Sequence, residues 1–227
     1  WECPDLYQTE EGWVVCVSPM GFLKEGDKEQ NHAICAEADF DEQTGTLTMA
    51  KAYQFADYGL DLYAPQSTVD EEGRRVVIGW MRMPKPVPDE KPWIGMMCTP
   101  RLAELRNHHI YYRIHPNVEK AFSKEISQVD KLEPGKPYQL KIALDDGESL
   151  SLGSYEIYRK GNKICTNREK VYQGISNCRL SFETPKLKEN AVLNILVDRN
   201  LIEVYVNDGE YVISNVVYNL MDFISLP

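Results

Sequence analysis

The sequence has no long hydrophobic run and no excess of basic residues. No apolar stretch approaches the roughly 18 consecutive apolar residues that a membrane-spanning helix needs, so we expect no membrane span. Lysine and arginine number 25 against 35 aspartates and glutamates, a net charge of −10 over 227 residues. Recognition of nucleic-acid phosphates needs a basic face, so we expect no nucleic-acid partner either.

The sequence also lacks the signs of a secreted protein. It has no N-x-S/T glycosylation acceptor, and no basic-then-apolar leader stands at its start. Its cysteines form neither a C-x-x-C pair nor the tight spacing of a disulfide scaffold. We therefore predict mostly free thiols and a cytoplasmic location. The six cysteines are Cys3, Cys16, Cys35, Cys98, Cys165 and Cys178.

Several motifs of metal and nucleophile chemistry are missing. The histidines show no H-E-x-x-H or comparable ligand spacing, which argues against a zinc site. There is no G-x-S-x-G elbow and no phosphate-binding glycine loop. We therefore expect no zinc site.

What is present is a pattern of many short β-strands. Residues 75–81, Arg-Val-Val-Ile-Gly-Trp-Met, form an apolar run typical of a strand buried on both faces. Leu140, Ile142 and Leu144 alternate with other residues, as in a half-buried strand. Residues 201–206 and 211–213 flank Asn-Asp-Gly, whose tolerance of positive φ favours a hairpin. The pattern predicts an all-β protein, a sandwich or a propeller.

A domain boundary is predicted near residues 115–135. Residues 117–122 are typical of a short helix or linker, and Glu133-Pro134-Gly135-Lys136-Pro137 predicts a turn. We therefore divide the chain into a β-domain at 1–115, a linker at 116–134 and a second β-domain at 135–227.

Two segments carry candidate chemistry. Glu2 stands between an aromatic residue and a Cys-Pro step, and glycosidases need two carboxylates that flank one glycosidic bond. Residues 57–66 combine carboxylates, phenols and an amide, which suit the faces and hydroxyls of sugars. Each feature also has a plain structural interpretation, as a surface acid and a polar loop with packing tyrosines.

Taken together and in this order, these motifs resemble the β-fructofuranosidases of glycoside hydrolase family 32, which include invertases and sucrose-6-phosphate hydrolases. The resemblance spans essentially the whole chain. The matching segments are Trp-Glu-Cys-Pro-Asp at 1–5, Tyr-Gly-Leu-Asp-Leu-Tyr-Ala at 58–64, Gly-Trp-Met at 79–81, Pro-Trp-Ile-Gly at 92–95 leading into Thr-Pro-Arg-Leu at 99–102, and 197–209.

The resemblance implies a five-bladed β-propeller followed by a β-sandwich. The chain would hold part of the third blade, the last two blades and the sandwich. Glu2 matches the family's general acid/base, and we expect it to be buried against Trp1. Cys3, Tyr58, Asp61 and Trp80 would bind the sugar, with no cofactor or metal. The implied reaction is retaining hydrolysis of the β-fructofuranosidic bond of sucrose or sucrose 6-phosphate.

The sequence departs from the family pattern at the nucleophile. The family's Asn-Asp-Pro-Asn-Gly and Arg-Asp-Pro motifs do not occur in these 227 residues. We therefore expect the chain alone to be inactive and to need the missing N-terminal part of the propeller, or another copy of the chain. Two other functions are a non-catalytic fructan- or sucrose-binding protein and a fructosyltransferase. Lys51, Arg74, Arg82 and Lys85 are candidate contacts for a substrate phosphate.

Overall fold

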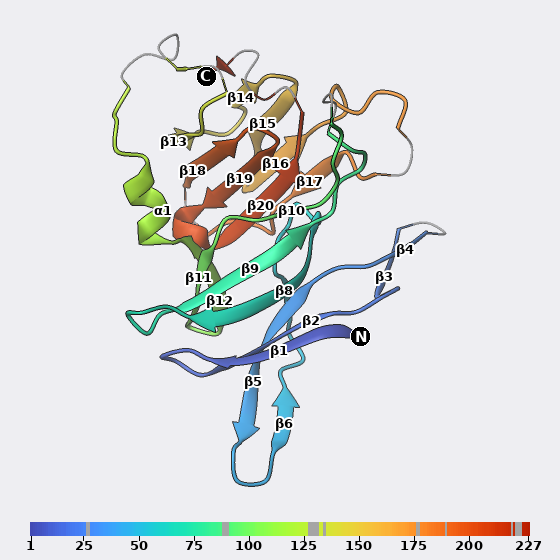
Figure 1. Ribbon diagram of the computed structural model, residues 1–227, viewed down its shortest axis with the longest axis vertical. Helices are drawn as coiled ribbons and strands as arrows, with labels where there is room; N and C mark the ends of the chain where they lie inside the picture. Colours follow the sequence, from blue (N-terminus) through green and yellow to red (C-terminus); the bar gives the residue numbers. More distant parts are fainter. Residues whose placement is uncertain are drawn as a thin grey trace.

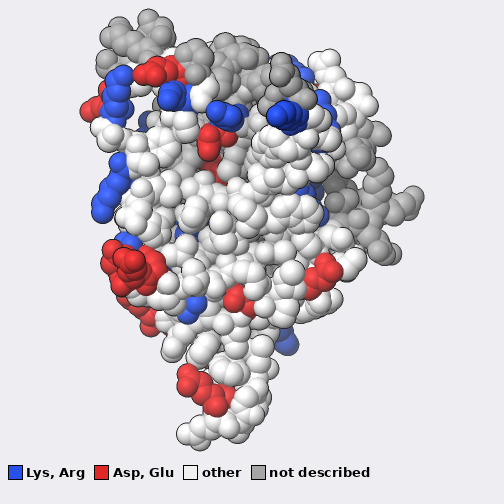
Figure 2. Space-filling view, viewed as in Figure 1, with Lys and Arg blue, Asp and Glu red and all other residues white. Residues whose placement is uncertain are grey.

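The computed structural model describes residues 1–25, 28–87, 91–126, 132–133, 135–175, 178–188, 190–218, 220 and 224–227. The predicted all-β class is confirmed, because strands dominate these residues. Two N-terminal sheets lie on one side of the molecule and a C-terminal sandwich lies on the other (Figure 1). Basic and acidic side chains form small separate groups on the face seen in Figure 2.

The first sheet is antiparallel and begins with the strand that carries Glu2. Its order is β1-β2-β5-β6, with β7 paired to the start of β5. A separate hairpin of β3 (Leu23–Glu25) and β4 (Lys28–Gln30) follows β2. The strands of the sheet are β1 (Glu2–Gln8), β2 (Trp13–Ser18), β5 (Ile34–Asp41), β6 (Thr46–Met49) and β7 (Gln54–Phe55).

The second sheet has the order β10-β9-β11-β12, with β8 on the other side of β9. Its strands are β8 (Leu62–Val69), β9 (Arg75–Met81), β10 (Met96–Met97), β11 (Arg101–Arg106) and β12 (His109–Ile114). The predicted strand at 75–81 is confirmed as β9. Its predicted burial on both faces is wrong, because Val77 and Met81 are buried while Ile78 and Trp80 are exposed.

Because β1 pairs with β2, the start of the chain belongs to the first sheet. The predicted assignment of these strands to part of a third blade and two further blades stays a prediction.

A short helix follows the second sheet, as the sequence predicts. It is α1 (Pro116–Ala121), and the side chain of its N-cap, His115, accepts a hydrogen bond from the Asn117 N–H at 3.1 Å. Residues 127–131 of the predicted linker and Pro134 of the predicted turn lie outside the described residues. On either side of Pro134, the Lys136 N–H donates to the Glu133 carbonyl at 3.2 Å.

The C-terminal half is a sandwich of two antiparallel sheets. One has the order β13-β18-β19-β20 and the other the order β17-β16-β15-β14-β21. The predicted hairpin is confirmed by β19, a 3₁₀ turn at Asn207–Gly209 and β20. The strands are β13 (Tyr138–Leu144), β14 (Ser149–Leu152), β15 (Tyr155–Lys160), β16 (Lys163–Asn167), β17 (Ser181–Glu183), β18 (Ala191–Asp198), β19 (Leu201–Val206), β20 (Tyr211–Val216) and β21 (Ile224–Ser225).

Strands β19 and β20 of the first sandwich sheet are buried on both faces. Val204 and Ile213 pack into the core of the sandwich. Tyr205 and Val212 belong to the core that includes residues of both N-terminal sheets. Because side chains alternate across a strand, this one sheet closes two hydrophobic cores and joins the two halves of the chain.

Candidate active site

Glu2 lies at the start of the edge strand β1. The pairing with β2 shifts register between Glu2 and Asp5, and Cys3 has a φ of 49°. A β-bulge of this kind redirects the neighbouring side chain. Glu2 and Cys3 are both exposed, and Trp1 is 72% exposed. The expected burial of Glu2 against Trp1 is therefore wrong for this chain.

Tyr63, the second residue of β8, is the direct partner of Glu2. Its hydroxyl donates to Glu2 Oε2 at 2.7 Å and lies 3.3 Å from the Ser18 carbonyl. Tyr63 is 7% exposed, and burial, followed by the hydrogen bond to Glu2, raises the pKa of Tyr63 to about 12. The phenol therefore keeps its proton at neutral pH and can hold the carboxylate of Glu2 in one place.

The surroundings of Tyr63 place further candidates near Glu2. Trp80 packs edge-on against Tyr63, with ring centroids 6.4 Å apart, and is 44% exposed. Gln66 donates from Nε2 to the Cys3 carbonyl at 3.1 Å. An exposed indole beside a held carboxylate can stack on the apolar face of a sugar while the carboxylate handles a proton.

The structure does not place Asp61 in this group. The side chain of Asp61 is buried, and both its oxygens accept from Arg168, at 2.5 and 2.9 Å. The backbone N–H of Val216 donates to Asp61 Oδ2 at 3.0 Å. Asp61 thus joins the second sheet to the sandwich and has a structural role.

Tyr58 lies at the same junction. Its ring packs edge-on against Phe55 at 5.6 Å and against Tyr211 of the sandwich at 5.2 Å. Its backbone N–H donates to the Val212 carbonyl at 2.8 Å. Of the five candidates from the sequence, the structure brings Glu2, Cys3 and Trp80 together around Tyr63, while Tyr58 and Asp61 contact the sandwich.

Sequence reasoning missed Tyr63, although it lies in a recognised segment, and it named Arg82 only as a candidate contact for a substrate phosphate. Tyr63 belongs to the matched stretch 58–64, but nothing in its composition separates it from Tyr58. The two tyrosines differ in position. Tyr58 lies in the loop before β8, whereas Tyr63 lies in the strand itself, which covers residues 62–69. Arg82 directly follows β9.

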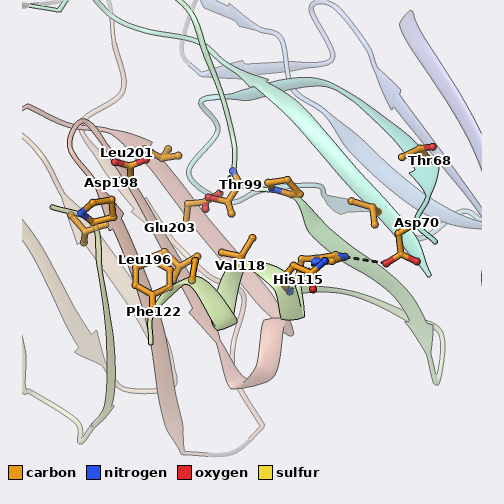
Figure 3. Close-up of a pocket in the computed structure, with 16 residues that line it drawn as sticks. Thr68, Asp70, Thr99, His115, Val118, Phe122, Leu196, Asp198, Leu201 and Glu203 are labelled. Carbon is orange, nitrogen blue, oxygen red and sulfur yellow. Dashed lines mark hydrogen bonds and ion pairs between the residues drawn. The ribbon is translucent and has the colours of Figure 1, made fainter. Parts of the chain in front are cut away.

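A separate cavity of about 710 Å³ lies between the second sheet, α1 and the sandwich (Figure 3). Val118, Phe122 and Leu196 line it. On one side of it, His115 Nε2 lies 3.0 Å from Asp70 Oδ2. None of its lining residues belongs to the group around Glu2, so the chemistry identified from the sequence is not located in this cavity.

The described residues contain no group of three or more His, Cys, Asp and Glu side chains placed to hold a metal ion. None of the helices described is long and apolar enough to cross a membrane. All six cysteines are free thiols in the structure.

The family of the chain follows from two matches that together cover most of it. Residues 1–116 match the model of the glycosyl hydrolases family 32 N-terminal domain, and residues 108–225 match that of the family 32 C-terminal domain. The chain belongs to glycosyl hydrolase family 32, and the resemblance predicted from its motifs is confirmed.

Relatives with known names fit this family. The chain is 27% identical over 240 residues to the sucrose-6-phosphate hydrolase of Bacillus subtilis (strain 168), covering 94% of this chain and 48% of that protein. It is 26% identical over 246 residues to the raffinose invertase of Escherichia coli, covering 98% of this chain and 50% of that protein. The chain thus spans about half the length of the curated relatives it matches.

Solved structures share the fold. The sucrose-6-phosphate hydrolase of Lactobacillus gasseri superposes with a TM-score of 0.74 at 20% identity, over 96% of this chain and 49% of that chain. A Bombyx mori family 32 β-fructofuranosidase gives 0.75, also at 20% identity and with the same coverage. The arrangement of N-terminal sheets and C-terminal sandwich is therefore that of the family.

Proposed function

We propose that this chain forms the C-terminal half of a retaining glycosidase that hydrolyses the β-fructofuranosidic bond of sucrose or sucrose 6-phosphate. The observation that supports this most directly is the 2.7 Å hydrogen bond from Tyr63 to Glu2, beside the exposed ring of Trp80. Membership of family 32 and the names of its relatives support the class of reaction.

In this proposal the two sheets of residues 1–114 are the last two blades of a five-bladed propeller. Residues 135–227 form the sandwich, and the stretch between them is the linker. The face of the second sheet supports an incomplete propeller. Trp80 and Met97 are register partners on β9 and β10, and Ile78 lies two residues from Trp80 on the same face. All three are exposed.

An apolar face of this kind is normally covered. We therefore propose that the N-terminal part of the propeller, or another copy of the chain, packs against Ile78 and Met97 and leaves the ring of Trp80 free for the sugar. The same partner would supply the nucleophile that the sequence of this chain lacks.

Glu2 would act twice in the reaction. As an acid, it would protonate the leaving glycosidic oxygen while the nucleophile of the partner attacks the anomeric carbon of fructose. As a base, it would then take a proton from the water that releases fructose. Since the nucleophile is not in this chain, the 227 residues alone would release no fructose.

The spacing of the cysteines supports a cytoplasmic location.

The test compares the chain alone with the longer protein that the proposal requires. In the longer protein, Glu2→Gln should lower fructose release from sucrose by about a hundredfold to ten-thousandfold, the usual contribution of general acid–base catalysis. An aryl fructoside whose leaving group needs no proton should form the fructosyl intermediate almost normally. Glu10→Gln, an exposed acid in the turn after β1, serves as the control.

Three results would contradict the proposal. Rapid hydrolysis by the chain alone would show that its nucleophile lies within these residues. Fructose-containing oligosaccharides in place of free fructose would identify a fructosyltransferase. Sugar binding without turnover, unchanged by Glu2→Gln, would identify a binding protein.

A further inference from the structure

Arg82 is a partly buried cation next to the candidate active site. Its Nη2 donates to the Leu60 carbonyl at 2.5 Å, and its guanidinium lies 5.0 Å from the centre of the Tyr63 ring. Its Nε has no hydrogen-bond partner. Within the part of the chain that the structure describes, Arg82 forms no ion pair.

The two other buried arginines at the junction of the two halves are compensated. Arg101 pairs with Asp57 and Glu203, and Arg168 pairs with Asp61. A buried charge without a partner is unfavourable, so the unpaired state of Arg82 requires an explanation. Asp61 is the carboxylate whose charge acts on Arg82, but both oxygens of Asp61 are engaged by Arg168.

The charge of Arg82 also acts on a buried histidine of the first half of the chain. His32 is 3% exposed, and the pKa of His32 is lowered to about 4 by burial and then by the charges of Arg82 and Arg179. Both arginines therefore lie close enough to act on one imidazole.

We propose that Arg82 binds the phosphate of a phosphorylated disaccharide, sucrose 6-phosphate, and so determines its preference over sucrose. This inference rests on the proposed function. Arg82 lies one phenol ring away from the carboxylate of Glu2. In sucrose 6-phosphate, the phosphate lies one hexose ring away from the glycosidic oxygen that Glu2 would protonate. The guanidinium fork also matches phosphate oxygens in geometry.

The other basic candidates from the sequence fit this role less well. Arg74 is engaged by Asp70 and Glu72. Lys85 lies over the rings of Tyr172 and Tyr218, near the sandwich. Lys51 is exposed just after β6. The contact with Tyr63 distinguishes Arg82 from all three.

The test measures kcat/KM for sucrose 6-phosphate and for sucrose in the longer protein. Arg82→Met keeps a side chain over Tyr63 and removes the charge. It should lower kcat/KM for sucrose 6-phosphate about tenfold to a hundredfold more than for sucrose, the loss expected for a charged hydrogen bond. Arg82→Lys should recover part of the preference. Arg75→Met is the matched control, because Arg75 stacks on Tyr7 in a similar way, at 5.5 Å.

Binding of glucose 6-phosphate, measured by calorimetry against glucose, gives a readout that does not depend on activity. Arg82→Met should abolish the preference for the phosphorylated sugar. Equal losses for both substrates, or an unchanged preference in Arg82→Met, would overturn the inference and leave Arg82 as a support for Tyr63. If neither substrate is hydrolysed, the proposed function fails, while the glucose 6-phosphate measurement still decides the role of Arg82.

Discussion

Tyr63 connects Glu2 to the rigid part of the second sheet. Its ring is buried between Trp80 and Arg82, and its hydroxyl reaches the carboxylate of Glu2 on the first sheet. Glu2 itself is exposed on an edge strand, so its position depends on this single side-chain contact and on the bulge at Cys3. We therefore regard Tyr63 as a positioning residue.

Removing the hydroxyl of Tyr63 should reduce catalysis without unfolding the protein. In the longer protein, Tyr63→Phe should lower kcat for sucrose about tenfold to a hundredfold, because a hydrogen bond to a charged group is lost. The loss should be smaller for an aryl fructoside that needs no proton, and the melting temperature should change little. Tyr58→Phe is the control. An equal loss of kcat in Tyr58→Phe would restore the role that the sequence assigns to Tyr58.

His32 should make stability depend on pH in the acidic range. Burial, with the charges of Arg82 and Arg179, lowers the pKa of His32 from 6.5 to about 4. Between these values the unfolded chain takes up a proton that the folded chain refuses, so stability falls as the pH falls from 6.5 to 4. Above pH 6.5 the group has no effect.

His32→Gln should therefore reduce the loss of unfolding free energy between pH 7 and pH 4.5 by about 2 kcal/mol, measured by urea titration. His108→Gln should act in the opposite direction. Pairing with Glu37 raises the pKa of the exposed His108, which favours the folded state at low pH. A pH dependence unchanged in His32→Gln would show that this imidazole titrates normally.

Among the elements, the loop before β8 is held against strand β20 of the sandwich. The Gly59 N–H donates to Asp57 Oδ1 at 2.8 Å, and the same oxygen accepts from the Ser214 N–H at 2.8 Å. A Cβ added at Gly59 would lie 2.0 Å from the Ser214 carbonyl oxygen. The glycine therefore permits a close approach of two backbones.

Gly59→Ala should force this loop away from β20. Because the obstacle is backbone, we expect a loss of about 3 kcal/mol of unfolding free energy, at the upper end of overpacking effects. Gly45→Ala is the control, since its Cβ would meet no atom within 4 Å and only its positive φ costs energy, about 1 kcal/mol. Equal losses of unfolding free energy in the two variants would show that the backbone at Ser214 moves aside without a large penalty.

Regular elements are well predicted where local pattern decides them. The hairpin of β19 and β20 follows from alternation around Asn-Asp-Gly, and β9 begins and ends at the predicted residues. The burial of β9 is predicted wrongly because apolar composition does not reveal which face is covered. Ile78 and Trp80 are apolar, yet they lie on an exposed face of the sheet.

For the molecule as a whole, a buried ion network joins the two halves. Arg101 of β11 donates to Asp57 at 2.8 Å, to Glu203 of β19 at 2.7 Å and to the Ser214 hydroxyl of β20 at 2.6 Å. Both ends of these ion pairs are almost fully buried. The network fixes the N-terminal sheets relative to the sandwich.

Arg101→Met should leave two buried carboxylates without a counter-charge. We expect a loss of about 3 to 5 kcal/mol of unfolding free energy, as for other broken buried pairs. The control is Arg106→Met at the surface, where ion pairs contribute less than about 1 kcal/mol. Urea unfolding of both variants measures this free energy. A small loss of unfolding free energy in Arg101→Met would contradict the prediction and show that the two carboxylates become protonated or hydrated at little cost.

From the sequence alone follow the all-β class, the main hairpin and the family, because these depend on local pattern and on motifs with fixed spacing. Only the tertiary structure separates the residues of 57–66 into two groups. Asp61 meets Arg168, which lies 107 positions further along the chain, while Tyr63 meets Glu2, 61 positions before it. The direction of a loop side chain depends on such distant partners. The sequence pattern therefore does not distinguish a residue of the candidate sugar site from a residue that binds the neighbouring domain.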